Sequence, residues 1–357
     1  MLLTISSAYA FAVCALLTAL PAPLVFAADF SGADATFPYP IYAKWAEAYK
    51  TATGKVLSYK AIGSAAGIEA VEALQVTFGA SDAPLTPWQP EKGGDLVQWP
   101  MVMGGIVPVV NLDGIKPNGM VLDGHVLAGI FLGEIKTWDD PRLKKLNAGL
   151  SLPPAAITVV HRSDGSGTTF NFTKYLSNAD ETWKAKVGSN TIVEWPTGTG
   201  AKGNQGVAGK VQETKNSIGY VEAAFAKQNK LTVTRMINNA GKAVEVGLVS
   251  VRAAAANWWW TNSDWLSGKG LVLNIINQPG EAAWPIAAAT FILMPAQVTD
   301  AEATREALNF FAWAYANGDQ AAEELDYVPL PLSVKHLAMQ IWTAIRAPDG
   351  KPVYDAR

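Results

Sequence analysis

The sequence predicts an α/β protein of two lobes joined by two crossing segments. Helix-type and strand-type patterns alternate from about residue 30 onward, which is typical of sheets flanked by helices. The length of 357 residues suffices for two cores at about 150 residues per domain. Two uncharged runs, 101–112 and 284–295, are interrupted by proline and fit buried strands rather than membrane spans. We therefore expect a mixed sheet flanked by helices in each lobe.

The composition excludes several classes of protein. The chain carries 28 Lys and Arg against 31 Asp and Glu, a net charge of −3. This balance gives no basic field for nucleic acid or anionic lipid. An apolar fraction of 49% excludes a disordered chain.

Residues 1–27 are predicted to be a secretory signal peptide. The segment has no charged side chain, and small or modest residues precede a cleavage position near Ala27. An uncleaved membrane anchor is the alternative. A signal peptide usually carries Lys or Arg before its apolar segment, and none precedes it here, so the position of the true start codon stays open. The one cysteine, Cys14, falls inside this segment after Val13, which argues against acylation. The mature chain then has no disulfide and no thiol nucleophile, and its scattered histidines predict no metal and no cofactor.

The first lobe is predicted from 28–104 and 284–357, with 105–283 inserted as the second. Within it, the patterns predict a helix over 41–53 that stops at Gly54, a strand over 56–61 and a small-residue turn over 63–67. A helix over 68–75 and a short strand before Asp82 follow. Helices over 303–316 and 334–346 complete the lobe. Trp258-Trp259-Trp260 could form a buried helix face or a stacking surface.

The strongest local signal lies at His161–Thr169. An apolar strand over 157–160 leads into glycines and hydroxyl residues, and a helix follows over 170–176. A strand, a small-residue loop and a helix N-terminus together make an anion site. Arg162 supplies a guanidinium suited to two oxygens, and Asp164 is placed to hold it. A helix capped by its own hydroxyls is an equally good interpretation of this segment.

Two further hydroxyl-bearing helix starts, at Thr36-Phe37 and at Ser64, would complete a cage of neutral dipoles around an oxyanion. Asp82 is unexpected there, because a carboxylate repels an anion unless the anion donates a proton. Phosphate carries such a proton at neutral pH and sulfate does not. Asp82 would thus discriminate between them, unless it is only a turn residue.

The motifs resemble those of the periplasmic phosphate-binding protein of high-affinity phosphate ABC transporters. The resemblance covers the whole mature chain and rests on GADATFP (32–38), IGS (62–64), FGASDAPL (78–85), GEIKTW (133–138), RSDGSGT (162–168), IGYVE (218–222), WPI (284–286), TFIL (290–293) and LDY (325–327). It implies a two-lobed periplasmic-binding-protein fold of type II that closes on one phosphate without catalysis.

Residue roles follow from this resemblance. It implies contacts to phosphate from Thr36, Phe37, Ser64, Asp82, Arg162, Ser166, Gly167 and Thr168, with Asp164 orienting Arg162. Asp34 and Ala65-Ala66 depart from the family pattern. The implied partners are inorganic phosphate and the permease subunits of the inner membrane, and the implied state is a periplasmic monomer.

Three other functions compete with this one. Ser166, Asp164 and His161 are the residue types of a hydrolase, but their spacing at a turn assembles no triad, and no nucleophile elbow exists. The tryptophan-rich stretch would suit a secreted adhesion protein. The same fold could bind arsenate, which shares the protonation of phosphate.

Overall fold

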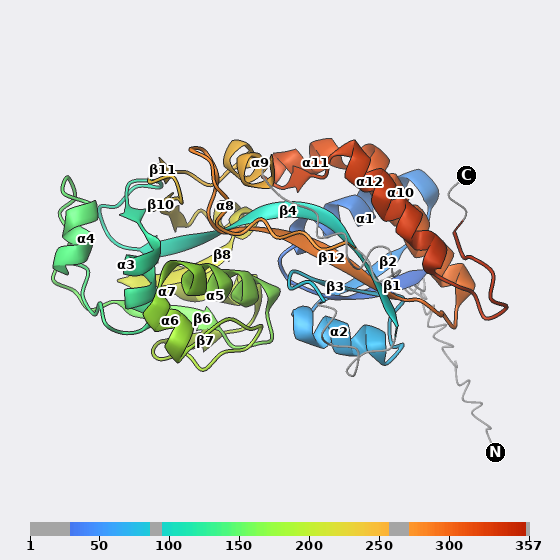
Figure 1. Ribbon diagram of the computed structural model, residues 1–357, viewed down its shortest axis with the longest axis horizontal. Helices are drawn as coiled ribbons and strands as arrows, with labels where there is room; N and C mark the ends of the chain where they lie inside the picture. The colour runs from blue at the N-terminus through green and yellow to red at the C-terminus, as the bar shows by residue number, and fades with distance from the viewer. Residues whose placement is uncertain (1–28, 86–94, 257–270, 355–357) are drawn as a thin grey trace, which may run out of the picture.

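The computed structural model describes residues 29–85, 95–256 and 271–354 and confirms an α/β protein of two lobes (Figure 1). The predicted signal peptide and the Trp258–Trp260 cluster lie outside the described residues. The strands are β1 Phe30–Asp34, β2 Leu57–Ala61, β3 Phe78–Ser81, β4 Leu96–Asn111, β5 Val121–Leu122, β6 Thr158–Arg162, β7 Thr199–Ala201, β8 Ser217–Glu222, β9 Thr232–Val233, β10 Arg235–Ile237, β11 Ala243–Val244, β12 Ala287–Pro295 and β13 Val328–Pro329. The helices are α1 Tyr39–Thr53, α2 Ser64–Glu72, α3 Gly124–Phe131, α4 Pro141–Leu146, α5 Gly167–Ala179, α6 Glu181–Lys186, α7 Gly203–Glu213, α8 Ala223–Gln228, α9 Leu248–Ala256, α10 Ala301–Asn317, α11 Asp319–Glu324 and α12 Leu332–Ile341.

One mixed sheet runs through both lobes in the order β2-β1-β3-β12-β4-β8-β6-β7. The outer strands pair in parallel with their neighbours, β1 with β2 and β3 in the first lobe and β6 with β7 and β8 in the second. The central strand β12 is antiparallel to both β3 and β4, and β8 is antiparallel to β4. Each lobe therefore contributes the carboxyl ends of its own parallel strands, and ligands bind at such ends in α/β sheets.

The two predicted crossing segments are the long neighbouring strands β4 and β12. Figure 1 shows β4 passing from one half of the molecule to the other with β12 beside it. β4 extends over Leu96–Asn111, so it begins earlier than the pattern predicted, and its residues between the two ends are all buried. The predicted lobe boundaries at 104/105 and 283/284 stay a prediction.

Local sequence explains most element ends. α1 has proline in its first turn, and Gly54 ends it with φ 77°, a left-handed conformation that glycine adopts without strain. The predicted turn at 63–67 is wrong, because α2 already starts at Ser64. Gly63 alone makes the turn, with φ 104°, and Ala65-Ala66 are good helix formers.

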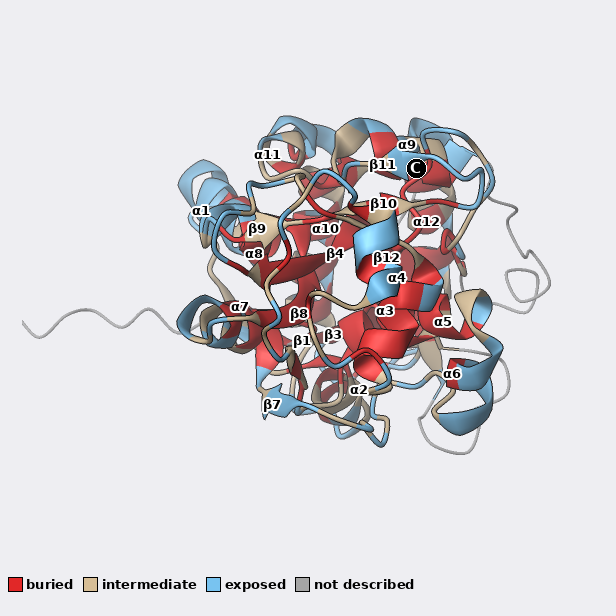
Figure 2. Ribbon diagram, turned by 90° about the vertical axis from the view of Figure 1, so that its left-hand side faces the viewer, coloured by how far each residue is buried: buried red, intermediate tan, exposed pale blue. Residues whose placement is uncertain are grey.

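Buried residues line the sheet and the inner faces of its helices, and exposed ones lie on outer helices such as α1 and α6 (Figure 2). The largest fully buried side chains include Trp99, Trp138, Trp183, Trp284 and Trp342. Within the described ranges, no helix combines the length and the apolarity that crossing a bilayer requires. The sheet and its helices present strand ends and helix starts between the lobes.

Candidate functional site

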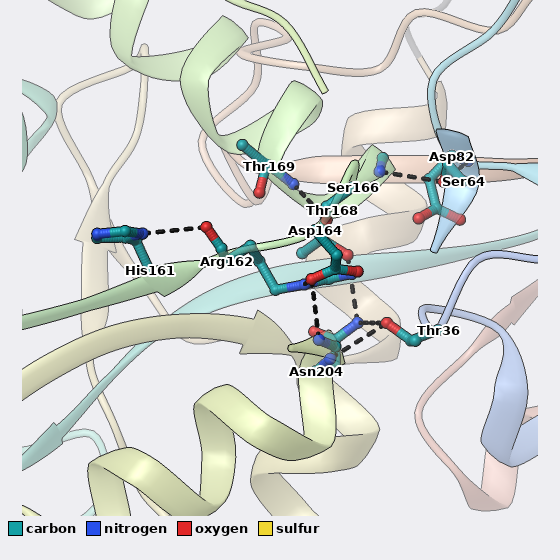
Figure 3. A network of polar contacts seen from close by, with 12 residues as sticks. Thr36, Ser64, Asp82, His161, Arg162, Asp164, Ser166, Thr168, Thr169 and Asn204 are labelled. Atoms are coloured by element: carbon teal, nitrogen blue, oxygen red, sulfur yellow. Dashed lines mark hydrogen bonds and ion pairs between the residues drawn. The ribbon is translucent and has the colours of Figure 1, made fainter. Parts of the chain in front are cut away.

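The predicted site residues lie at strand ends and helix starts that face each other between the lobes. In the first lobe, Thr36 and Phe37 follow β1, Ser64 opens α2 after β2, and Asp82 follows β3. In the second lobe, Arg162 ends β6 and Ser166 is the N-cap of α5. Figure 3 shows side chains from both lobes turned toward one another. All are nearly or fully buried: Thr36 is 8% exposed, Arg162 3% and Asp82 1%.

Four hydroxyl groups each accept at least one hydrogen bond from a nitrogen donor. The Ser64 hydroxyl oxygen accepts from the Gly167 N–H at 3.0 Å and the Asp82 N–H at 3.4 Å. Ser166 accepts from the Thr169 N–H at 3.0 Å, so it does cap its own helix. Thr36 and Thr168 likewise accept from a side-chain amide. A hydroxyl has one proton to donate. Among the described residues none of the four donates it to a protein acceptor, which leaves four donors for a ligand rich in acceptors.

Asn204 at the start of α7 is the residue that the sequence analysis missed. Its Nδ2 donates to Thr36 Oγ1 at 2.9 Å and to Thr168 Oγ1 at 3.2 Å, and its backbone N–H also donates to Thr36 at 3.1 Å. Its Oδ1 accepts from the Glu222 N–H at 2.9 Å, which fixes which way the amide points. One amide thus orients a hydroxyl from each lobe. The only local signal was an asparagine at a glycine-led helix start.

Arg162 is held by Asp164 as the sequence analysis expected. Its Nε and Nη2 donate to the two oxygens of Asp164 at 2.7 and 2.5 Å, and Asp164 also accepts from the Gly203 N–H at 3.0 Å. Burial acts to raise the pKa of Asp164, but the hydrogen bonds and charge of Arg162 outweigh it and leave the pKa below its usual value. The remaining nitrogen, Arg162 Nη1, is buried and has no protein partner. It is a strong donor available for a ligand.

Asp82 is a second buried ionisable group of the site with a free atom, because its Oδ1 has no hydrogen-bond partner. Burial raises the pKa of Asp82 to about 7, against the opposing effects of Thr290 and the positive charge of Arg162. The Thr290 hydroxyl affects Asp82 from nearby, although it makes no hydrogen bond of good geometry. A buried carboxyl oxygen without a hydrogen-bond partner is costly, and a ligand that donates a proton to it would remove that cost. The cage therefore offers one acceptor among several donors.

Glycines allow the two lobes to approach this closely. A Cβ on Gly167 would lie 2.6 Å from the Asp82 Cβ and 2.7 Å from the Ser64 Oγ, so no larger residue fits. Asn171 adds a direct link, since its Nδ2 donates to the Asp82 carbonyl at 2.7 Å. Ala65, a departure from the family pattern, packs against Gly165, on which a Cβ would lie 2.4 Å away. The side chain of Asp34, the other departure, is not among those described.

His161 does not belong to the cage. Its ring stacks on Trp195 with centroids 4.8 Å apart, and its Nδ1 lies 3.0 Å from the Arg162 carbonyl oxygen. It makes no hydrogen bond to Ser166 or Asp164 among the described residues, so no hydrolase triad forms there. Among all the residues that the structure describes, no three His, Cys, Asp or Glu side chains are grouped to hold a metal.

Comparison with known proteins shows the family of this chain. Residues 27–317 match the model of the PBP superfamily domain. The chain is 48% identical to the phosphate-binding protein PstS of Xylella fastidiosa over 314 residues, 88% of this chain and 85% of that protein. It is also 48% identical to PstS of Haemophilus influenzae, over 90% of this chain and 94% of that one. The chain belongs to the PstS family.

Solved structures support the two-lobed fold of this PstS family member. A high-affinity periplasmic phosphate-binding protein, PfluDING, solved with bound phosphate, superposes with a TM-score of 0.66 at 22% identity over 89% of this chain and 98% of its own. The phosphate-binding protein of Stenotrophomonas maltophilia gives 0.61 at 20% identity over 89% and 94%. The PstS family consists of substrate-binding proteins rather than enzymes.

Proposed function

We propose that this protein binds inorganic phosphate in the periplasm, as a monomer without catalysis, and delivers it to the permease subunits of an ABC transporter. The observation that carries the proposal is the pair of unpartnered buried atoms, Arg162 Nη1 and Asp82 Oδ1. A ligand that satisfies both must accept from a guanidinium and donate to a carboxylate. Protonated phosphate does both, while the four oriented hydroxyls supply donors for its other oxygens.

The ligand contacts proposed for this site are those of Thr36, Phe37, Ser64, Asp82, Arg162, Ser166, Gly167 and Thr168. Their support is their convergence between the lobes and the hydrogen bonds that the hydroxyls accept. Delivery to a permease and the periplasmic location are supported by membership in the PstS family, whose members compared above are named phosphate-binding proteins.

Isothermal titration of ligand-stripped protein with phosphate, sulfate and arsenate tests this proposal. We expect one phosphate per chain, comparable binding of arsenate because it shares the proton, and much weaker binding of sulfate. Phosphate at about 100 times its dissociation constant should add roughly 2.7 kcal/mol to the free energy of unfolding. Sulfate bound as tightly as phosphate, or a melting temperature unchanged by millimolar phosphate, would refute it.

A further inference from the structure

A second fully buried carboxyl, Glu222, lies beside the cage and pairs with no cation among the described residues. It ends β8, where its strand partner is Ile106 on β4, the long strand that both lobes share. Its Oε2 accepts from the Ala224 N–H at 2.8 Å and lies 2.8 Å from the Tyr327 hydroxyl. The same Tyr327 hydroxyl lies 2.6 Å from the Phe37 carbonyl oxygen. Three oxygens therefore form a chain from the end of β8 to the cage.

Counting protons along this chain fixes the state of Glu222. Two short contacts join three oxygens, and each contact needs a proton between its atoms. The Phe37 carbonyl has no proton to give, and the Tyr327 hydroxyl has one. If each contact is a full hydrogen bond, rather than one proton shared by both, the second proton comes from Glu222 and its carboxyl is neutral.

The surroundings of Glu222 favour the neutral form as well. Its other oxygen, Oε1, is buried without a hydrogen-bond partner. Packing there is tight, since a Cβ on Gly104 would lie 3.2 Å from Oε1 and 2.9 Å from the Phe37 ring. Burial raises the pKa of Glu222 well above its usual value, against the opposing effects of the contacts with Tyr327 and the Ala224 N–H, and the negative charge of Asp326 adds to the rise.

Other charged groups near the chain do not supply a counter-ion for Glu222. Asp326 is itself paired with Lys227 at 2.7 Å. Burial is the largest cause that raises the pKa of Tyr327 well above its usual value. Tyr327 therefore stays protonated and can pass on one hydrogen bond.

We propose that Glu222 is a positioning residue for the anion site: as a neutral acid it donates to Tyr327, which donates to the Phe37 carbonyl and so fixes the Thr36–Phe37 segment. The proposal rests on phosphate binding at that segment. Glu222 also holds Asn204 through its backbone N–H. The end of β8 thereby positions ligand donors in both lobes.

Affinity measurements on full-length, ligand-stripped protein test the positioning. Tyr327→Phe should weaken phosphate binding about tenfold, the effect of one buried hydrogen bond. Tyr315→Phe is the matched control, because Tyr315 is also buried and donates to a backbone carbonyl, that of Pro100 at 2.5 Å, outside the site. We expect both variants to lower the melting temperature and only Tyr327→Phe to lower phosphate affinity.

Glu222→Gln tests the acid directly. Its amide must present the oxygen to the Ala224 N–H, so Tyr327 turns its proton toward the amide and releases the Phe37 carbonyl. We expect a loss of affinity similar to that of Tyr327→Phe, and no added loss in the double variant. Equal affinity for Tyr327→Phe and Tyr315→Phe, or additive losses in the double variant, would overturn the proposal.

Infrared difference spectroscopy gives a readout that does not depend on phosphate. In the Asp82→Asn background, which removes the other buried acid, subtracting the Glu222→Gln spectrum at neutral pH should leave the carbonyl band of a protonated carboxylic acid. A carboxylate band instead, from variants whose circular dichroism spectra match that of the parent, would overturn the proposal. A parent protein that fails to bind phosphate would refute the proposed function while this band still reports on Glu222.

Discussion

Asp164 binds the Arg162 guanidinium through two nitrogens, at 2.7 and 2.5 Å, and leaves Nη1 as the one nitrogen without a protein partner. This arrangement turns a buried cation into an oriented donor. The ion pair is almost fully buried, with the Arg162 side chain 1% and the Asp164 side chain 11% exposed. Breaking such a pair strands a charge, so both residues matter for the site and for the fold.

Arg162→Ala should lower phosphate affinity more than Ser166→Ala or Thr168→Ala. It removes the cation of the proposed contacts, and a charge-assisted hydrogen bond is about twice as strong as a neutral one. It also leaves Asp164 unpaired next to the anion. Titration calorimetry of the three variants in one buffer measures the order, and a larger loss for either hydroxyl variant contradicts the assignment.

Asn204→Ala should weaken phosphate binding about tenfold, because the Thr36 and Thr168 hydroxyls then lose the amide that orients them. Asn238→Ala serves as the control. Asn238 is also a buried asparagine, and it donates to the carbonyls of Gly280, Glu281 and Ala283, outside the site. Both variants should lose stability on thermal unfolding. Unchanged affinity in Asn204→Ala would show that the hydroxyls orient themselves.

Gly167→Ala should reduce phosphate affinity strongly with little change in the fold of either lobe. Its methyl group would collide with Asp82 and Ser64 across the lobe interface and hold the lobes apart. Gly209→Ala, in α7, is the matched control, because a methyl group there meets no atom within 4 Å. Small-angle X-ray scattering with saturating phosphate should give a larger radius of gyration for Gly167→Ala alone. Equal radii and affinities would mean that the lobe interface shifts to accommodate the methyl group.

Asp82 should make the ligand-free protein less stable as pH rises. Its pKa rises from 3.8 to about 7 on folding, so between these values the folded state holds a proton that the unfolded state has lost. The free energy of unfolding therefore falls from about pH 4 to pH 7, by roughly 4 kcal/mol for a shift of about three units. Above pH 7 the penalty stays constant.

Asp82→Asn cannot ionise and should remove this slope. Denaturant unfolding at pH 4 and pH 8 measures it, with the exposed Asp113→Asn as control. The difference in unfolding free energy between Asp82→Asn and the parent should move in favour of the variant at pH 8. A difference that does not change with pH would mean that folding does not raise the pKa of Asp82.

Sequence patterns could predict the strand-to-helix turns, because each turn is written locally in glycines, hydroxyls and flanking apolar runs. They placed the Arg162–Asp164 pair correctly, since the two residues are neighbours at one turn. They could not find Asn204, whose partner Thr36 is 168 positions away and is met only in the folded protein. They also placed the start of α5 at Phe170, whereas the Ser166 cap lets the helix begin at Gly167.

Glu222 and Tyr327 stand out in the sequence only as members of two family motifs, and no pattern predicted their contact. Their contact spans 105 positions and depends on how β8 and the segment before β13 pack around the Phe37 carbonyl. Propensity and periodicity describe a residue's own element, and such a meeting is a property of the packed sheet.

The phosphate-to-sulfate affinity ratio, measured by competition in the parent and in Asp82→Asn, tests the central claim most directly. If Asp82 accepts the ligand's proton, sulfate leaves a buried carboxylate unpaired, and a site built for a hydrogen-bonding group rejects its analogue by about 10⁴–10⁵-fold. The account predicts a large ratio in the parent and a much smaller one in Asp82→Asn, mainly because sulfate gains affinity. The same ratio in both proteins would contradict it and would leave Asp82 as a turn residue.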